Sequence, residues 1–245
     1  MPTLTNKIAL VTGASRGIGA SIAEHLAAAG ATVAITYNSS TEQAEAIVKK
    51  INNAGGKAKA FQSDAGDPAA NTELIQRIVD EFGGLDILVN NAGVYATGML
   101  VGTELDILTR NYEVNVRGVY ETTKAAIPQL NEGGRIINIG SVSGLKGSPG
   151  ASAYGASKAA VASLTQAWAK EVGERGITVN TIHPGSVDTE MNPASGPYAD
   201  MQRASNIFGR FGRPEEIASV VTFIAGPGSS FITGANIPVD GGYTA

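Results

Sequence analysis

Short runs of β-branched and other apolar residues alternate with longer amphipathic segments along the first third of the chain. A short apolar run predicts a strand, and apolar residues repeating every three to four positions predict a helix. The alternation predicts a parallel sheet covered by helices on both faces. The predicted strand and helix pairs are Ile8 to Val11 with Ile18 to Ala29, Thr32 to Thr36 with Thr41 to Asn53, and Lys57 to Gln62 with Pro68 to Phe82.

The same rhythm continues through most of the remaining sequence. Asp67 before Pro68 is typical of a helix start, and Gly30 and Gly55 are typical of residues just after a helix end. We therefore predict an α/β fold in a single domain over residues 1–245. Further strands are predicted at Leu85 to Val89, Arg135 to Ile139 and Ile177 to Ile182, and long helices at about Glu104 to Leu130 and Ala153 to Glu174.

One segment, at about 186–213, breaks the rhythm with an Asn-Pro-Ala-Ser-Gly-Pro cluster at 192–197. It follows the carboxyl end of a predicted strand, which is where open α/β sheets bind their ligands. Apolar side chains such as Met191, Tyr198 and Phe208 favour a lid that closes over a substrate. The alternative is an ordinary surface excursion packed on the core.

Composition narrows the class of protein. At 245 residues and 43% hydrophobic content, the chain is long enough to bury a substantial core. The absence of cysteine excludes disulfides, thiolate nucleophiles and zinc–thiolate sites, and the two separated histidines predict no metal centre. A net charge of -4 with scattered basic residues gives no footprint for nucleic acid or an anionic membrane. No apolar run is long enough to span a bilayer and none resembles a signal peptide, so we predict a cytoplasmic protein.

A glycine-rich turn, Thr12 to Gly19 (TGASRGIG), follows the first predicted strand and opens the first predicted helix. Backbone amides at such a helix start can hold a pyrophosphate, although a tight strand-to-helix connection is the simpler alternative. No lysine follows the glycines, which argues against a nucleoside triphosphate loop. Residues 13–17 also fit the G-x-S-x-G elbow of hydrolases. The candidate base His183 stands directly before Pro184, so hydrolysis is disfavoured.

A second group of motifs carries candidate chemistry. Ser141 lies in GSVSG after a predicted strand, and YGASK places Tyr154 and Lys158 four residues apart on one helix face. With NNAG at 90–93 and HPGSVDT at 183–189, these motifs run through nearly the whole chain in a fixed order. Here the chain closely resembles the short-chain dehydrogenase/reductase family, whose fold is a Rossmann-like, doubly wound parallel sheet.

The resemblance implies hydride transfer between nicotinamide C4 and a carbonyl carbon. Tyr154 would be the acid in reduction and the base in oxidation. A free phenol has a pKa of about 10, so we expect the Lys158 ammonium to lower it by about 3. By resemblance Lys158 also binds the nicotinamide ribose, Ser141 polarises the substrate oxygen, and Asn115 anchors a water that links Lys158 to solvent.

The same resemblance assigns the cofactor contacts. Thr189 and the Val187 backbone would hold the nicotinamide carboxamide. Asp64 would contact the adenine, and Asn90 would line the adenine ribose side. Asp64 is otherwise a turn residue. The predicted cofactor-binding residues are Gly13, Ser15, Arg16, Gly17, Ile18, Gly19, Tyr37, Asn38, Ser39, Asp64, Ala65, Asn91, Ala92, Gly93, Tyr154, Lys158, Pro184, Gly185, Val187 and Thr189.

The end of the second predicted strand bears on the choice of cofactor. NAD enzymes carry an acid about 20 residues beyond the glycine loop to hold the ribose 2'-hydroxyl. Residues 37–40 read Tyr-Asn-Ser-Ser instead, and Arg16 offers a planar donor fork for a 2'-phosphate. We therefore predict NADP(H), with use of both cofactors, or a merely solvated Arg16, as the alternatives.

The resemblance favours a ketoreductase similar to 3-oxoacyl thioester reductases and general carbonyl reductases. A sugar or polyol dehydrogenase and a non-catalytic dinucleotide sensor are the alternatives, and the presence of both Tyr154 and Lys158 argues against the sensor. A homotetramer is also implied, through the long helices and the C-terminal segment. Reductases that serve an acyl carrier protein carry two docking arginines. Arg175 matches one, but Glu132 stands at the other, so the use of carrier-bound substrates stays open.

Overall fold

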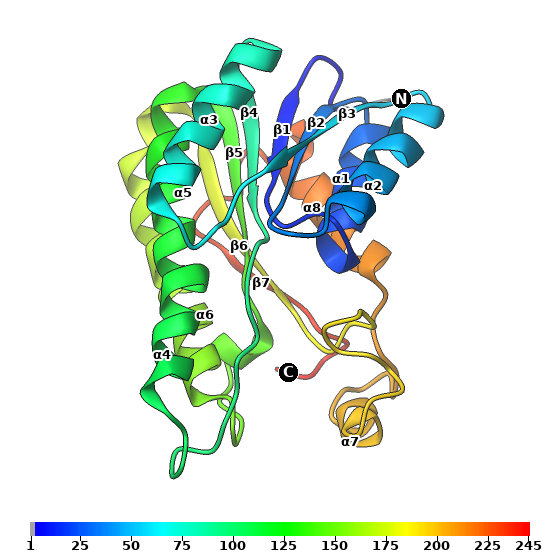
Figure 1. Ribbon diagram of the computed structural model, residues 1–245, viewed down its shortest axis with the longest axis vertical. Helices are drawn as coiled ribbons and strands as arrows, with labels where there is room; N and C mark the ends of the chain where they lie inside the picture. The colour runs from blue at the N-terminus through cyan, green and yellow to red at the C-terminus, as the bar shows by residue number, and fades with distance from the viewer. Residues whose placement is uncertain (1–2) are drawn as a thin grey trace.

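Parallel strands form one sheet at the centre of the computed structural model, which describes residues 3–245 (Figure 1). Within these residues the sheet has seven strands in the order β3-β2-β1-β4-β5-β6-β7. The order reverses direction between β1 and β4, which opens a crevice at the carboxyl ends of these strands. The strands are β1 Ile8–Val11, β2 Thr32–Tyr37, β3 Lys57–Gln62, β4 Leu85–Asn90, β5 Leu130–Ile139, β6 Thr178–Pro184 and β7 Asn236–Val239.

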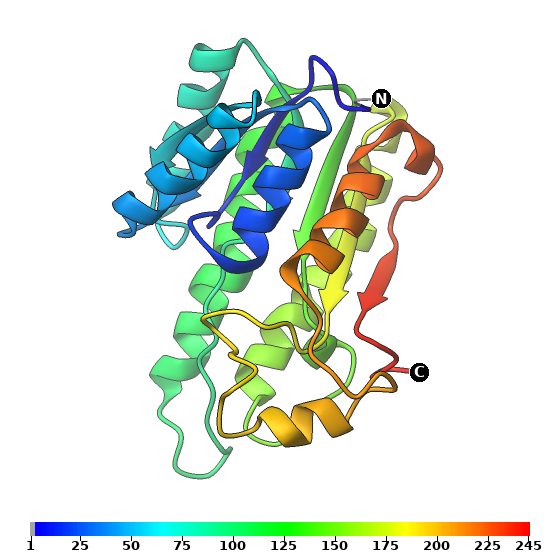
Figure 2. The ribbon, with the colours of Figure 1, turned by 90° about the vertical axis from the view of Figure 1, so that its right-hand side faces the viewer.

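Helices cover both faces of the sheet. Side chains of α1 and α8 bury one apolar layer, and side chains of α3, α5 and α6 bury the other. Figure 2 shows α1 (blue) beside α8 (orange), in keeping with their extensive mutual contact. The helices are α1 Gly17–Ala28, α2 Thr41–Asn53, α3 Pro68–Phe82, α4 Leu105–Tyr112, α5 Val119–Ala126, α6 Ser152–Glu171, α7 Ala199–Ala204 and α8 Pro214–Ala225.

The parallel α/β fold predicted from the alternation is confirmed. The predicted caps are also present: the Asp67 carboxylate accepts hydrogen bonds from Ala69 N and Ala70 N at the start of α3. Gly30 and Gly55 follow α1 and α2 with φ of 100° and 85°, the left-handed region that glycine adopts at low cost. Local capping signals therefore fixed these helix ends.

The predicted long helix from Glu104 to Leu130 is wrong in two respects. A π-helical segment, Glu113–Gly118, separates α4 from α5, and the helical region closes in a 3₁₀ turn that contains Pro128. Leu130 already begins β5, because proline removes a backbone donor and ends the helix. The π-helical segment brings Gly118 so close to the Ala65 carbonyl that a Cβ there would overlap it.

Two elements near the C-terminus were not predicted. β7 is a short, half-buried edge strand with Pro238 within it, and proline is tolerated only at such an edge. The apolar helix α8 begins at Pro214, directly after the predicted lid. The segment 186–213 itself contains α7 and otherwise turns. Within residues 3–245, no helix combines the length and apolar character needed to cross a membrane.

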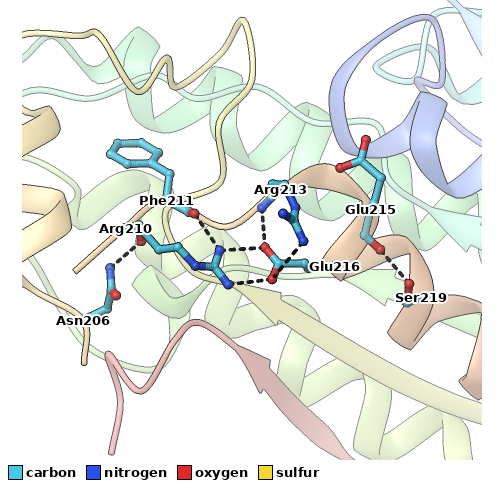
Figure 3. Close-up of polar contacts among 7 residues, drawn as sticks. All are labelled: Asn206, Arg210, Phe211, Arg213, Glu215, Glu216 and Ser219. Carbon is cyan, nitrogen blue, oxygen red and sulfur yellow. Dashed lines mark hydrogen bonds and ion pairs between the residues drawn. The ribbon is translucent and has the colours of Figure 1, made fainter. Parts of the chain in front are cut away.

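The end of the segment 186–213 is tied to α8 by a charged cluster (Figure 3). The Arg210 guanidinium donates from both terminal nitrogens to the Glu216 carboxylate, at 2.8 and 2.7 Å. Arg213 N donates to the same carboxylate at 2.8 Å, which caps α8. The hydrogen bond from Arg210 lowers the pKa of Glu216 to about 2, with further help from Arg213. The pair is therefore fully ionised at neutral pH.

Candidate active site

A cleft of about 800 Å³ lies at the carboxyl ends of the central strands. Loops after β1, β2, β4, β5 and β6 form its walls, which is the usual position of a ligand site in an open α/β sheet. The predicted cofactor-binding residues from Gly13 to Thr189 all line this cleft, with the exception of Asn90, and so does Ser141. Asn115 does not line it. The sequence motifs, far apart along the chain, thus meet in one place.

The glycine-rich turn forms one end of the cleft. Gly13 and Gly17 have φ of 62° and 56°, so other residues would be strained at both positions. A Cβ at Gly13 would also lie 2.8 Å from Ala92 Cα, so the close approach of the β1 and β4 loops requires glycine. No side chain caps the N-terminus of α1, where Arg16 is extended. The free amides of that first turn suit an anion such as a pyrophosphate.

Hydrogen bonds between neighbouring loops hold the glycine-rich turn in place. Thr12 Oγ1 accepts from Asn91 N and Ala92 N, both at 3.0 Å. Asn91 Nδ2 donates in turn to the carbonyl oxygens of Thr12 and Gly13, both at 2.9 Å. Gly13 N donates to Thr36 Oγ1. Sequence reasoning missed Thr12 and Thr36, although a threonine at the end of a strand beside a glycine turn is a usable signal.

Asn90 does not lie where the resemblance placed it. Its side chain is buried and donates to Thr123 Oγ1 at 2.9 Å and to Asn138 Oδ1 at 2.8 Å. Successive residues of a strand point to opposite faces, and Asn90 faces α5 while the cleft lies elsewhere. The expectation that Asn90 lines the adenine ribose side is therefore wrong. It belongs to the buried packing between β4 and β5.

Arg16 meets an acidic residue at the mouth of the cleft. Its Nε lies 3.5 Å from Glu190 Oε2, and both side chains are more than half exposed. Asn38 and Ser39, at the end of β2, line the same part of the cleft, and no acidic side chain stands among residues 37–40. Asp64 also lines the cleft, where its Oδ1 accepts from Gly66 N and shapes the local turn. Glu190 was missed by the sequence reasoning, although it directly follows Thr189.

Ser141, Tyr154 and Lys158 come together at the other end of the cleft. Ser141 Oγ accepts a 3.1 Å hydrogen bond from Ser143 N, and the Ser141 side chain lowers the pKa of Tyr154. One turn further along α6, Lys158 Nζ lies 5.9 Å from the Tyr154 ring centroid. Nζ donates a 2.8 Å hydrogen bond to the carbonyl oxygen of Ile139, the last residue of β5. These contacts fix the three functional groups around one open position.

Burial dominates the electrostatics of this end of the cleft. It raises the pKa of Tyr154 to about 12, against a lowering by the Ser141 hydrogen bond, and Tyr95 adds a small further rise. Burial also lowers the pKa of Lys158 to about 8. The net shift of the Tyr154 pKa is thus upward, opposite to the lowering expected from Lys158, because desolvation of the phenolate is its largest cause. At neutral pH Tyr154 keeps its proton and is poised as a donor.

Asn115 supports the site from beneath. It is fully buried in the π-helical segment, where Oδ1 accepts from Val94 N at 2.9 Å and Nδ2 donates to Val94 O at 3.0 Å. Nδ2 also lies 3.1 Å from Ser157 Oγ. Asn115 thus clamps the loop after β4 against α6. Its hydrogen bonds run to this loop, to Ser157 on α6 and to Asn111 Oδ1 on α4, and Lys158 is not among its direct partners.

Tyr95 is a further residue that sequence reasoning missed. Its ring packs edge-on against Tyr154, with centroids 4.8 Å apart and planes at 86°, and it lines the cleft. Aromatic pairs favour this arrangement, which restricts the orientation of both rings. Its position two residues after the NNAG motif was the available signal.

A dinucleotide-sized cleft that joins an uncapped glycine turn to a serine, a tyrosine and a lysine defines an oxidoreductase site on a Rossmann-like sheet. A family model described as "Enoyl-(Acyl carrier protein) reductase" matches residues 13–244. A short-chain dehydrogenase from Burkholderia cenocepacia, solved in complex with NADP, is 48% identical, with a TM-score of 0.97 over 99% of this chain and 100% of that one. The chain belongs to the short-chain dehydrogenase/reductase family.

Relatives of different function lie at similar distance from this chain. A 3-oxoacyl-[acyl-carrier-protein] reductase of Synechocystis sp. is 40% identical over 245 residues, covering 99% of this chain and 98% of that protein. The cyclic-di-GMP-binding biofilm dispersal mediator protein of Escherichia coli is 38% identical over 246 residues, covering both chains completely. Overall similarity therefore establishes an oxidoreductase fold, and the substrate has to be inferred from the residues of the site.

Proposed function

We propose that this protein is an NADP(H)-dependent ketoreductase that reduces a ketone to a secondary alcohol. The observation that carries the proposal is the grouping of Ser141, Tyr154 and Lys158 at one end of a cleft that also contains the glycine-rich turn. Neutral Tyr154 is the proton donor, and the Ser141 hydroxyl orients and polarises the carbonyl oxygen. The Lys158 ammonium stabilises the negative charge that develops on the phenol as it gives up its proton.

NADP(H) fits the residues at the other end of the cleft. The uncapped backbone amides at the start of α1 would hold the pyrophosphate of the cofactor. Arg16, Asn38 and Ser39 would bind its 2'-phosphate. Thr189 and Val187 would bind its carboxamide. When bound, the cofactor supplies the hydride. Ser63 Oγ, buried beside Asp64 in the lining of the cleft, has no hydrogen-bond partner, which is consistent with a polar ligand at this position. The NADP complex of the Burkholderia relative supports the same choice.

The substrate class follows from the lining near Tyr154. Tyr95 packs on Tyr154, and Val94, Val142 and Met191 also line the cleft with apolar side chains, which suits the acyl or hydrophobic part of a ketone better than a polyol. A 3-oxoacyl thioester or a small oxo-ester combines such a part with the required carbonyl. The Synechocystis relative, named for 3-oxoacyl reduction, supports this class over the sugar or polyol alternative.

The proposal extends to a lid and an assembly. Met191, Tyr198 and Met201, in the segment 186–213, expose large apolar side chains that closure over a bound substrate would cover. Leu105, on α4, and Tyr120, on α5, are also exposed, which supports helix pairing between copies in a cytoplasmic homotetramer. For a homotetramer, light scattering coupled to size-exclusion chromatography should give a molar mass of about four times the 25.0 kDa of one chain.

The function is tested by following NADPH absorbance with free ketones, oxo-esters, 3-oxoacyl thioesters and sugars. We expect turnover of the ketones and thioesters that depends on Tyr154, with sugars poor. Binding of cyclic-di-GMP without turnover of any carbonyl would overturn the proposal in favour of a dinucleotide sensor, the function that the name of the Escherichia coli relative suggests.

A further inference from the structure

His183 is a buried polar group for which the catalytic roles above leave no task. It lies in β6 with a fully buried side chain, directly before Pro184. Its Nδ1 lies 2.9 Å from the carbonyl oxygen of Ser141 and 3.3 Å from Ser141 N. Its Nε2 lies 2.9 Å from Asn236 Oδ1 on the edge strand β7. The ring therefore connects the serine of the site to the next two strands of the sheet.

Both neutral forms of this ring hydrogen-bond to the backbone of Ser141. With the proton on Nδ1, the ring donates to the Ser141 carbonyl oxygen. With the proton on Nε2, it donates to Asn236, and Nδ1 accepts from Ser141 N. The connection to Ser141 is thus independent of the tautomer.

Gly140 provides the space for this contact. A Cβ at Gly140 would lie 2.6 Å from His183 Nδ1 and 2.8 Å from its Cε1. A neighbour at that distance would have to move, so a larger residue at 140 would displace the ring from the Ser141 backbone. The glycine at the end of β5 and the histidine at the end of β6 therefore form one packed unit.

The position of the Ser141 backbone determines where its hydroxyl points. The Ser141 carbonyl oxygen accepts from Gly144 N at 2.9 Å as well as facing the ring, and Oγ accepts from Ser143 N. These bonds hold the turn from within. His183 ties the Ser141 backbone itself to β6, beside the backbone hydrogen bond from Gly140 N to Ile182 O. Small displacements of a group that orients a substrate cost large factors in rate.

We propose that His183 is a positioning residue that fixes the Ser141 backbone, and through it the Ser141 hydroxyl, at the distance and angle needed by the ketone and Tyr154. The inference rests on the proposed ketoreductase function. It assigns a role in turnover to a buried histidine that does not itself line the cleft. His183 is neither a hydrolytic base nor a metal ligand in this reading.

The test is a double-substitution cycle between His183 and Ser141 on the full-length protein. His183→Phe keeps a planar ring in the same space and removes both hydrogen bonds, whereas His183→Asn keeps an amide near the Ser141 backbone. We expect His183→Phe to lower kcat by about 10- to 100-fold and to change the KM for NADPH by less than about threefold. His183→Asn should recover part of the loss.

The Ser141→Ala background separates positioning from packing. If His183 acts through the serine hydroxyl, adding His183→Phe to Ser141→Ala changes kcat by less than about twofold. A full additional loss in the double variant, or wild-type turnover in the single variant, would overturn the inference. Where Ser141→Ala is too slow to measure, the pH profile of alcohol oxidation by His183→Phe alone decides. Because Ser141 lowers the pKa of Tyr154, a displaced Ser141 should shift this profile upward relative to wild type, and an unshifted profile refutes the role.

Two controls keep the outcomes distinct. Thermal unfolding and NADPH fluorescence titration report whether each variant folds and binds the cofactor, and His183→Asn serves where His183→Phe fails to fold. A wild-type protein that reduces no ketone would instead contradict the proposed function itself.

Discussion

Lys158 donates a 2.8 Å hydrogen bond from Nζ to the carbonyl oxygen of Ile139, so its ammonium is held at the carboxyl end of β5 and is shielded from solvent. This position places the charge 5.9 Å from the centre of the Tyr154 ring. The lysine is thus held by the sheet, while the tyrosine ring is held by its edge-on contact with Tyr95. A proton donor with pre-set partners requires little reorganisation during reaction.

Replacement of Tyr154 by phenylalanine tests the donor. The ring and its edge-on contact with Tyr95 remain, and only the phenol proton is lost, so kcat should fall by about 10²-fold or more. The dissociation constant for NADPH, measured by fluorescence titration, should stay within about threefold. Lys158→Ala should impair both quantities. Turnover near the wild-type value in Tyr154→Phe would identify a different proton donor.

The pH dependence of reduction should report Lys158. Burial lowers the Lys158 pKa to about 8, so the ammonium is present below that pH and is lost above it. The pKa of Tyr154, raised by burial to about 12, keeps the phenol neutral throughout this range. We therefore expect kcat/KM for NADPH, which reports on the free enzyme, to be level below about pH 8 and to decline above it. A profile that rises through pH 8 would contradict the assignment.

The same pKa shift predicts the sign of a stability change. The folded-state pKa of Lys158 lies below the ordinary value of 10.5, so the unfolded chain binds more protons between about pH 8 and that value. The contribution of Lys158 to the free energy of unfolding should therefore rise with pH across this window. Lys158→Met should remove that part of the slope in urea denaturation measured at several pH values. An unchanged slope would show that the lysine is not desolvated in solution.

Cofactor preference should depend on Arg16 and on its acidic partner. Arg16→Ala should reduce the ratio of kcat/KM for NADPH to that for NADH by at least about tenfold, equivalent to about 1.4 kcal/mol. Glu190→Gln removes the carboxylate that lies 3.5 Å from Arg16 Nε and would compete with a 2'-phosphate for the guanidinium. That variant should lower the KM for NADPH and leave the KM for NADH unchanged. A wild-type preference for NADH would refute the NADP(H) assignment.

The sequence predicted the sheet and nearly all of the cleft, because strand periodicity and contiguous motifs are local signals. What it could not predict depends on contacts between distant segments. The Arg16–Glu190 pair and the edge-on contact of Tyr95 with Tyr154 arise only when separate loops meet. The Tyr154 pKa was misjudged for the same reason, since sequence shows a neighbouring charge four residues away and gives no measure of burial. Short strand β7, with its proline, carried too weak a pattern to be recognised.

The last prediction concerns the carrier of the substrate and rests on Glu132. In this structure Glu132 Oε1 accepts a 2.8 Å hydrogen bond from Arg175 Nε, and Arg175 also donates to the carbonyl oxygen of Ile127. The arginine that matches a carrier-docking position is therefore engaged within its own chain, and an exposed acid stands beside it. An acidic carrier protein meets repulsion from Glu132 and a partly neutralised Arg175, an effect that salt weakens.

Free ketones and oxo-esters should consequently be better substrates than carrier-bound 3-oxoacyl groups. Glu132→Arg should raise kcat/KM for the carrier-bound thioester at low salt by about tenfold, with little change for the free thioester. Glu132→Gln is the matched control, because it removes the charge and retains the shape, and it should give a smaller gain. The gain should shrink as salt is added, since the interaction is electrostatic. A strong preference of the wild-type protein for the carrier-bound form would show that docking proceeds through another surface, and that Glu132 is merely a solvated residue at the edge of β5.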